Sequence, residues 1–421
     1  MGALFGLAIV WPFAATAADD EPLHQVSSEV CKECHSEIYK QWNGSMHANS
    51  TALKDPIHGT FYKKVAGDPT KEGVIHKASG KYPVCLQCHS PNAARDKTTK
   101  LDAKPAYSEG VNCVACHLLK SYKGIQSPTG KLQLGLKSYE VSDKLQGPGR
   151  HSNFGLKKLS ASGDDMFGGA DLDADKKPNP HLGEPVELDG KPIQALPMEA
   201  NSLQQKTSDA CMGCHDQRNN PHGVPLCQTG NEYSMSQTQV NCLACHMPIN
   251  DGLADHSMGG GHDLAMLQRS VAFDIDVESK GDTLETKVTV LNQQPHSLPT
   301  GAPFRNIYMK LTAYDGSGNV VWENAEGHPG KADPQAYFVY ALADDEGGPA
   351  MPPTATQLGQ DTRIKPHEKR VLNYGIPAKD VALVRGELHY NLLWPVLVEK
   401  FKHLPDHLKE PTLIAVSEVT L

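Results

Sequence analysis

Ten of the eleven cysteines in this chain stand in five pairs with two residues between the partners, and a histidine directly follows each pair. The five segments are "CKECH" at residue 31, "CLQCH" at 85, "CVACH" at 113, "CMGCH" at 211 and "CLACH" at 242. Two thiols at this spacing can add across the two vinyl groups on one edge of a porphyrin, and the adjacent histidine is then held under the iron as an axial ligand. The pattern predicts five covalently bound c-type haems.

The attachment residues follow from the motif. The predicted thioether residues are Cys31, Cys34, Cys85, Cys88, Cys113, Cys116, Cys211, Cys214, Cys242 and Cys245, and the predicted proximal ligands are His35, His89, His117, His215 and His246. A thioredoxin-like dithiol and a zinc ribbon also use paired cysteines, but neither requires a histidine after every pair. Cys227 has no pair mate and is expected to be a small buried residue.

The second axial position of each iron needs another ligand, and the 20 histidines of the chain are ample for bis-histidine ligation. His47 ends an expected short helix after the first motif, His151 lies in a Gly/Pro loop, and His296 begins the C-terminal region. The predicted distal ligands are His47, His151, His256, His262 and His296, with His58, His76, His181 and His222 kept as further candidates. Sequence order does not say which histidine serves which iron.

Part of the chain is doubled, since "CKECHSEIYKQWNGSMH" leading to "GVNCVACH" is matched by "CMGCH", "NEYSMSQTQ" and "QVNCLACHMP". The match places Thr238 opposite His47. The haem of the second copy must therefore find a histidine elsewhere or keep an open coordination site. An open iron would be the place to look for reactivity.

The chain divides into three regions. Residues 1–18 resemble an export signal, with an apolar run and small residues Ala15 and Ala17 before the expected cleavage point, so the mature protein is expected to be periplasmic or extracellular with no membrane span. Residues 19–265 form the expected pentahaem domain of short helices and loops. In residues 266–421 polar and apolar residues alternate, which predicts an antiparallel, immunoglobulin-like β-sandwich interrupted by a helix around "PVLVEKFKHL". The expected fold class is α+β.

The quoted motifs, with "CHSP", "CHMP" and "EGVNCVACH", resemble those of exported multihaem cytochromes of the cytochrome c-554 family. The tail "HSLPTGAPFRNIYMKLTAYDGSG" is similar to the β-domain attached to many such cytochromes. The resemblance implies an electron carrier with stacked, mostly bis-histidine haems, and it supports ligand roles for His47, His151, His256 and His296. Cytochrome c-554 itself has four haems and no β-domain, so its haem order and partner do not transfer.

Two functions remain open, and a third has little support. The net charge of −9, with no long basic run, gives no sign of nucleic-acid binding. The first function is a non-enzymatic carrier that passes electrons between redox protein partners and self-assembles through the β-domain, as far as conductive filaments. The alternative is an oxidoreductase acting on a small nitrogen or sulfur compound at one five-coordinate haem. The third, a carbohydrate-binding β-domain, has no aromatic stripe to support it.

Overall fold

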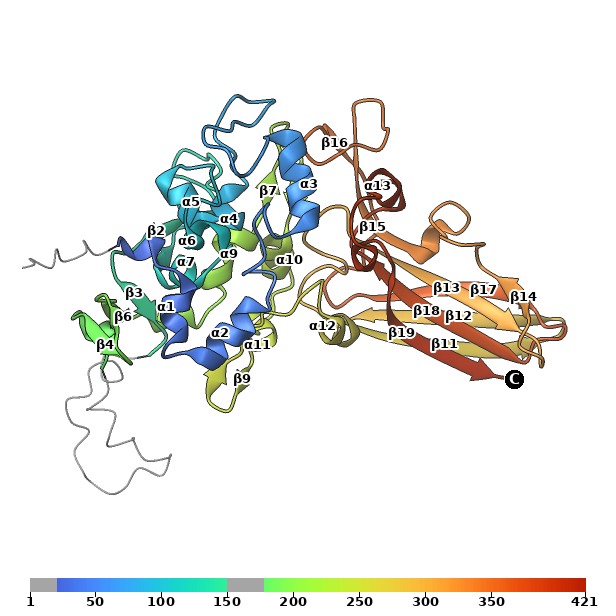
Figure 1. The fold of residues 1–421 in the computed structure, drawn as a ribbon. Coiled ribbons are helices and arrows are strands. Elements are labelled where there is room, and N and C mark those ends of the chain that lie inside the picture. Colours follow the sequence, from blue (N-terminus) through green and yellow to red (C-terminus); the bar gives the residue numbers. More distant parts are fainter. Residues whose placement is uncertain (1–20, 150–177) are drawn as a thin grey trace, which may run out of the picture.

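The computed structural model describes residues 21–149 and 178–421. The expected export signal and His151 lie outside the described residues. Two parts stand side by side (Figure 1): a compact N-terminal part of short helices and loops, and a C-terminal part of long strands with the C-terminus at its far end. The α+β fold class is confirmed.

The N-terminal part consists of short elements. Its helices are α1 (Ser28–Lys32), α2 (Ser36–Asn43), α3 (Pro56–Val65), α4 (Leu86–His89), α5 (Pro91–Asp96), α6 (Pro105–Ser108), α7 (Cys113–His117), α8 (Ser202–Gln205), α9 (Asp209–His215), α10 (Thr229–Met235) and α11 (Cys242–His246). Its strands are β1 (Leu119–Tyr122), β2 (Tyr139–Val141), β3 (Leu145–Gly147), β4 (Val186–Leu188), β5 (Lys191–Ile193), β6 (Met198–Ala200), β7 (Arg218–Asn219), β8 (Pro225–Cys227), β9 (Ile249–Asn250) and β10 (Leu253–Ala254). They pair only as two-stranded sheets, β1 with β2, β3 with β6, β4 with β5, β7 with β8 and β9 with β10.

The helices of this part begin at recognisable caps. Asp55 accepts hydrogen bonds from the backbone N–H groups of Ile57 and His58 at the start of α3, and Pro56 takes the first helical position. Asn112 caps α7 and Asn241 caps α11 by accepting from the N–H three residues later. Local capping thus fixes where the short helices that carry the motifs begin.

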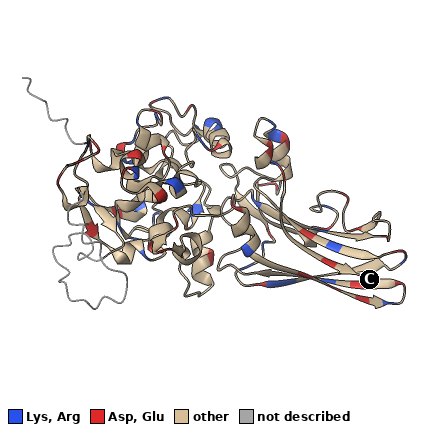
Figure 2. Cartoon of the chain, turned by 60° about the horizontal axis from the view of Figure 1, so that its bottom comes forward, with Lys and Arg blue, Asp and Glu red and all other residues tan. Residues whose placement is uncertain are grey.

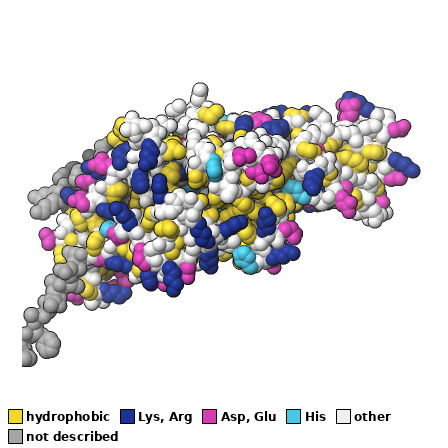
Figure 3. Space-filling view, turned by 90° about the horizontal axis from the view of Figure 1, so that it is seen from above, with side chains coloured by type: hydrophobic (Ala, Val, Ile, Leu, Met, Phe, Trp, Pro, Cys, Tyr) yellow, Lys and Arg dark blue, Asp and Glu magenta, His cyan; other side chains and the backbone are white. Residues whose placement is uncertain are grey.

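The N-terminal part has small protein cores. One contains Tyr62, Leu86 and Leu101, and another contains Val26, Val114 and Leu118. Large apolar side chains elsewhere in this part are exposed: Leu203 is 81% exposed, Met235 74% and Ile249 68%. Figure 3 shows apolar side chains at the surface among the lysines on one face of the molecule. Protein alone leaves much apolar surface uncovered here.

The C-terminal part is a two-sheet sandwich. It contains α12 (Leu264–Arg269), β11 (Val271–Lys280), β12 (Thr283–Asn292), β13 (Asn306–Tyr314), β14 (Val320–Glu323), β15 (Tyr337–Ala343), β16 (Gln357–Asp361), β17 (Lys369–Pro377), β18 (Leu383–Asn391), α13 (Pro395–Lys400) and β19 (Thr412–Thr420). One sheet has the order β11-β12-β17 and the other β16-β15-β13-β18-β19, with β14 beside β13, and all neighbours are antiparallel. The first, second and seventh strands share one sheet while the third, eighth and ninth share the other, which is an immunoglobulin-like arrangement. The helix expected at "PVLVEKFKHL" is α13.

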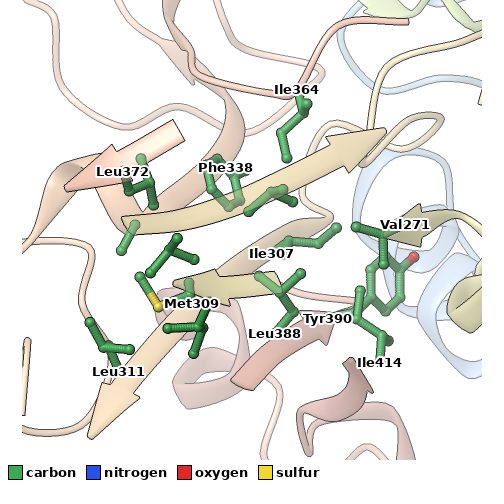
Figure 4. Packing of buried hydrophobic residues seen from close by; sticks show 14 of the residues in the cluster. Val271, Ile307, Met309, Leu311, Phe338, Ile364, Leu372, Leu388, Tyr390 and Ile414 are labelled. Atoms are coloured by element: carbon green, nitrogen blue, oxygen red, sulfur yellow. The ribbon is translucent and has the colours of Figure 1, made fainter. Parts of the chain in front are cut away.

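Alternation along the strands builds the sandwich core. In β12, Leu284, Thr286, Val288 and Val290 are buried, while the residues that alternate with them are more exposed. The apolar side chains among them meet residues of the opposite sheet, such as Met309 and Leu388 (Figure 4). The core belongs to both sheets, so each sheet needs the other to cover its apolar face.

The two parts share a hydrophobic cluster. Ile57 on α3 and Val224 beside β8 belong to the same buried cluster as Leu342 on β15 and Leu397 on α13. The ring of Phe61 stacks on that of Phe304, with centroids 5.1 Å apart. Figure 2 shows that Lys and Arg positions and Asp and Glu positions are interspersed along both parts. The β-sandwich is therefore packed against the N-terminal part through an apolar contact.

Candidate haem centres

Each Cys-x-x-Cys-His motif lies on one helical turn. In α4, α7, α9 and α11 the final histidine ends the helix, so the second cysteine and the histidine stay within one turn of the first cysteine. The first motif spans the junction of α1 and α2, where the N–H of His35 donates to the carbonyl of Cys31 at 2.9 Å. All eleven cysteines are free of disulfides. The thiols of every motif are thus available on the turn that carries its histidine.

Three of the motif histidines face a second imidazole at a distance that suits a shared metal. Ring centroids are 6.0 Å apart for His35 and His181, 6.0 Å for His47 and His215, and 6.4 Å for His246 and His296. A metal about 2.0 Å from one nitrogen of each ring would put the two centroids about 6 Å apart. These three pairs therefore have the spacing of two axial ligands on one iron.

The second motif has a closer pair. The rings of His58 and His89 have centroids 4.0 Å apart and are tilted by 41°. Both Nδ1 atoms are hydrogen-bonded to the carbonyl of Ser50, at 2.8 Å and 3.0 Å. An iron between these rings would require them to separate by about 2 Å. The Nε2 atom of His58 is buried and has no hydrogen-bond partner among the described residues, so its lone pair is free to bind a metal.

The third motif lies near His256. The Nδ1 atom of His117 donates to the carbonyl of Gln146 at 2.8 Å, and the backbone N–H of His256 donates to Oε1 of Gln41 at 2.9 Å. Burial lowers the pKa of His117; the charge of His256 acts in the same direction, and the hydrogen bond to Gln146 opposes both. His256 is thus within electrostatic reach of His117.

Backbone carbonyls orient most of these rings through Nδ1. The contacts are His89 and His58 to Ser50, His117 to Gln146, His181 to Leu196, His246 to Gly259, His256 to Ala254 and His296 to Ser297. A proton on Nδ1 leaves the lone pair of Nε2 free for a metal, and such outer contacts also fix the ring orientation. The chain holds these imidazoles in the tautomer that an iron ligand requires.

Two comparisons identify the family to which this arrangement belongs. Residues 30–118 match the family model described as cytochrome c554 and c-prime. A solved structure, a penta-haem cytochrome c552 from Thermochromatium tepidum, is 62% identical with a TM-score of 0.88, and the match covers 95% of this chain and 100% of that one. The chain belongs to the penta-haem c-type cytochromes. It binds five c-type haems covalently, and its five Cys-x-x-Cys-His motifs are the predicted attachment sites.

The other comparisons add nothing to this assignment. No curated protein matches the cytochrome. A DUF1425 family member from Shewanella sp. pv-4 is 13% identical over 29% of this chain and 74% of that one, and its TM-score of 0.16 is too low to carry an argument. In the described part of the cytochrome, no helix has the length and apolar character needed to cross a membrane.

The protein environment of the cytochrome suits haem. Burial lowers the pKa of His47 to about 4 and that of His215 to about 3, and it holds the pKa of His58 well below its usual range. Neutral imidazole is the form that binds iron. The exposed apolar residues Leu203 and Met235 lie on α8 and α10, the helices that precede the fourth and fifth motifs.

The structure shows which of the candidate distal histidines lie beside a predicted proximal histidine. His47, His256 and His296 lie at or near proximal histidines of the cytochrome, as described above. His262 instead lies beside Arg305 and His407 and lines a cavity of about 450 Å³, where it is exposed. Its ligand role and that of His151 stay predictions. The rings that face His35 and His89 belong to His181 and His58, which were only further candidates.

The cysteines also show which motifs are neighbours in space. The thiols of Cys31 and Cys113 each shift the pKa of the other, and so do those of Cys211 and Cys242, so the members of each pair lie close together. The two pairs occupy equivalent places in the sequence repeat. A third pair, Cys88 and Cys214, joins the second motif to the fourth. The first motif therefore lies beside the third, the fourth beside the fifth, and the second beside the fourth.

A close packing contact fixes the fourth motif. The hydroxyl of Tyr139 accepts a hydrogen bond from the N–H of Gly213 at 2.8 Å, and it lies 3.0 Å from the carbonyl of Ala210. A Cβ atom on Gly213 would lie 1.9 Å from Cε2 of Tyr139. Glycine is therefore the residue that fits between the two cysteines of this motif.

Proposed function

We propose that this cytochrome carries electrons between redox proteins outside the cytoplasm, and that both axial positions of each haem iron are occupied by histidine. The haems supply reversible one-electron chemistry, and an iron with two histidine ligands has no free site for a substrate. The pairs that we propose are His35 with His181, His89 with His58, His117 with His256, His215 with His47, and His246 with His296. The observation that carries the proposal is the set of opposed imidazoles about 6 Å apart.

The adjoining cysteines support a connected haem chain. The first and third haems form one end and the fourth and fifth the other, with the second haem beside the fourth. The neighbouring thiols Cys242 and Cys88 and burial raise the pKa of Cys211 and Cys214, and the charge of Cys116 adds a smaller effect in the same direction, so the third motif also lies near the fourth. Cys34 and Cys245 are exposed, and they belong to the first and fifth motifs. We propose that partners exchange electrons with these two end haems.

Export rests on the N-terminal segment of the sequence, which fits a periplasmic or extracellular site. Self-assembly into filaments receives no support from the described residues. His296 lies in a loop of the β-sandwich and faces His246 of the fifth motif. In this proposal the sandwich therefore covers one side of the fifth haem, which stands at one end of the row of haems. That position favours a role in completing the haem site over a role as a free assembly module.

The alternative, an oxidoreductase with one open haem, is disfavoured by the opposed imidazoles. Thr238 does not leave the fourth motif without an opposing ring, because His47 from the first copy of the repeat faces His215. The pair with the least regular spacing is His58 and His89. If one haem were open, the second would be the first place to look.

The test is electron paramagnetic resonance of the oxidised, haem-loaded protein together with titration by cyanide and, after reduction, by carbon monoxide. We expect every iron to be low-spin and slow to bind either ligand. A high-spin iron that binds a ligand rapidly would overturn the bis-histidine proposal and favour the oxidoreductase.

A further inference from the structure

A buried carboxylate of the haem-bearing part reaches the loop that carries His296. Glu232 lies on α10 and is 8% exposed. Its Oε2 atom accepts hydrogen bonds from the backbone N–H of Ser297 at 3.1 Å and from Oγ1 of Thr300 at 2.7 Å. The residue next to a proposed iron ligand is therefore held by a side chain from the other part of the molecule.

The other oxygen atom of the Glu232 carboxylate also has a partner. Oε1 of Glu232 lies 2.5 Å from Nη1 of Arg363, which is 6% exposed. Arg363 also donates to Asp361, through Nε at 2.9 Å and Nη2 at 3.0 Å, and its guanidinium lies over the ring of Tyr340. Both charges have partners, so Glu232 has little freedom to move away from Ser297.

The opposite side of the same loop is held by the β-sandwich. Nδ2 of Asn292, at the end of β12, donates to the carbonyl of His296 at 2.8 Å. Leu298 and Ile364 exchange two backbone hydrogen bonds, at 2.8 Å and 3.0 Å. The loop is thus fixed from the sandwich by Asn292 and Ile364, and from the haem-bearing part by Glu232.

We propose that Glu232, paired with Arg363, is a positioning residue that holds the His296 loop at the distance needed to bind the fifth haem iron. The proposal rests on the proposed ligation by His296. Without the carboxylate, the loop remains attached to the sandwich, but its link to α10 is reduced to the contact between Thr229 and Thr300, whose hydroxyls are 2.9 Å apart. His296 would then detach from the iron more often, and an added ligand would enter faster.

The decisive variant is Glu232→Met with Arg363→Met. It removes both buried charges together, a replacement that proteins often tolerate, and it removes the acceptor for Ser297 and Thr300. The fully haem-loaded variant is compared with the unchanged protein, with His296→Ala, and with Asp276→Asn, which breaks an exposed ion pair on the sandwich. The readouts are the fraction of high-spin iron and the rate of carbon monoxide binding to the reduced protein.

We expect the double variant to bind carbon monoxide at one haem about tenfold faster or more, in the direction of His296→Ala, because hydrogen bonds to a charged group are lost. Asp276→Asn should match the unchanged protein. If His296→Ala opens a haem and the double variant does not, the positioning role is wrong and the proposed ligation stands. If His296→Ala itself changes nothing, the proposed ligation fails and the positioning role fails with it.

Should the double variant not acquire five haems, Glu232→Asp replaces it. This variant keeps the negative charge for Arg363 but withdraws the carboxylate from Ser297 by one methylene. A carbon monoxide rate equal to that of the unchanged protein would overturn the positioning role, and a faster rate confined to one haem would support it.

Discussion

His47 and His215 face each other with ring centroids 6.0 Å apart, although one follows the first haem motif and the other completes the fourth. The sequence repeat aligns Thr238 with His47, so the second copy has no counterpart of this histidine. The first copy contributes its histidine to the second. The two halves of the haem-bearing part are therefore joined through one coordination site in the proposed bis-histidine arrangement.

Replacing His47 by Ala is expected to open the fourth haem. The iron loses one of its two proposed ligands, so one of the five haems should become high-spin and the protein should bind about one cyanide per chain. The measurement is paramagnetic resonance with cyanide titration of the oxidised protein. His222→Ala is the matched control because His222 is exposed. An all-low-spin spectrum of the His47 variant would contradict the assignment.

Replacing Gly213 by Ala is expected to destabilise the fourth motif. The new methyl group would overlap the ring of Tyr139, and relieving such overlap costs about 1–3 kcal/mol. Thermal unfolding followed in the haem absorption band should begin several degrees lower. Gly316→Ala serves as control, because a Cβ there meets no atom within 4 Å. Equal midpoints for the two variants would show that Tyr139 moves aside freely.

The N-cap asparagines of α7 and α11 occupy equivalent places in the two copies of the repeat, but replacing them by Ala should lower the free energy of unfolding by different amounts. Asn112 is 1% exposed, and besides capping α7 at 3.0 Å it bonds Asn92 and Glu109 at 2.8 Å and 3.0 Å. Asn241 is only half-buried; it caps α11 at 3.0 Å and donates to the carbonyl of Lys206 at 3.1 Å. We expect Asn112→Ala to cost about 2–3 kcal/mol and Asn241→Ala about 1 kcal/mol in denaturant unfolding. The opposite order would mean that capping alone, and not the buried network, sets the cost.

Acid should weaken the contact at Asp361. Burial alone would raise the pKa of this carboxyl, but hydrogen bonds from Arg363 and Lys365 outweigh burial and lower the pKa from 3.8 to about 2. A depressed folded-state pKa stabilises the folded protein above the unfolded value, and this stabilisation is lost as pH falls from 3.8 towards 2. Asp361→Asn should therefore cost about 1 kcal/mol at pH 7, after allowing for solvent screening.

The measurement for this variant is urea unfolding over a series of pH values. The difference between Asp361→Asn and the unchanged protein should shrink as the pH approaches 2, while Asp276→Asn should show little difference at any pH. A difference that stays constant down to the lowest pH at which the protein folds would assign the effect to packing instead of charge.

The sequence was most informative where the chemistry is local. Five consecutive residues contain both thiols and the predicted proximal histidine of each haem, so spacing alone predicted those sites and the number of haems. Alternation in segments such as 284–292 predicted the strands of the sandwich. The distal histidines are different, because the path of the chain decides which ring meets which motif. His181 lies in an Asn/Pro turn much like the Gly/Pro loop of His151, and nothing in the local residues ranked it higher.

The contact between the parts was also beyond local inference. In the sequence, Glu232 is a charged residue on a short helix and Arg363 is a charged residue of the sandwich. Nothing in their local sequence indicates that they form a pair. Only the packing of α10 against the segment that follows β16 turns them into a buried pair. Likewise, Ser50 carries no motif, yet its carbonyl bonds both rings of the second site.

The distance along the chain between His47 and His215, and between His246 and His296, has a consequence for how the protein matures. Everything needed to attach a haem covalently is present within five consecutive residues, so attachment can proceed on a chain that has not folded. The proposed second ligand of these sites arrives only when remote segments dock, and in one case that segment is the loop between β12 and β13 of the sandwich. In the proposed bis-histidine arrangement, covalent loading and closure of the iron are thus separate events, and closure of these sites reports that remote parts of the chain have reached their native positions.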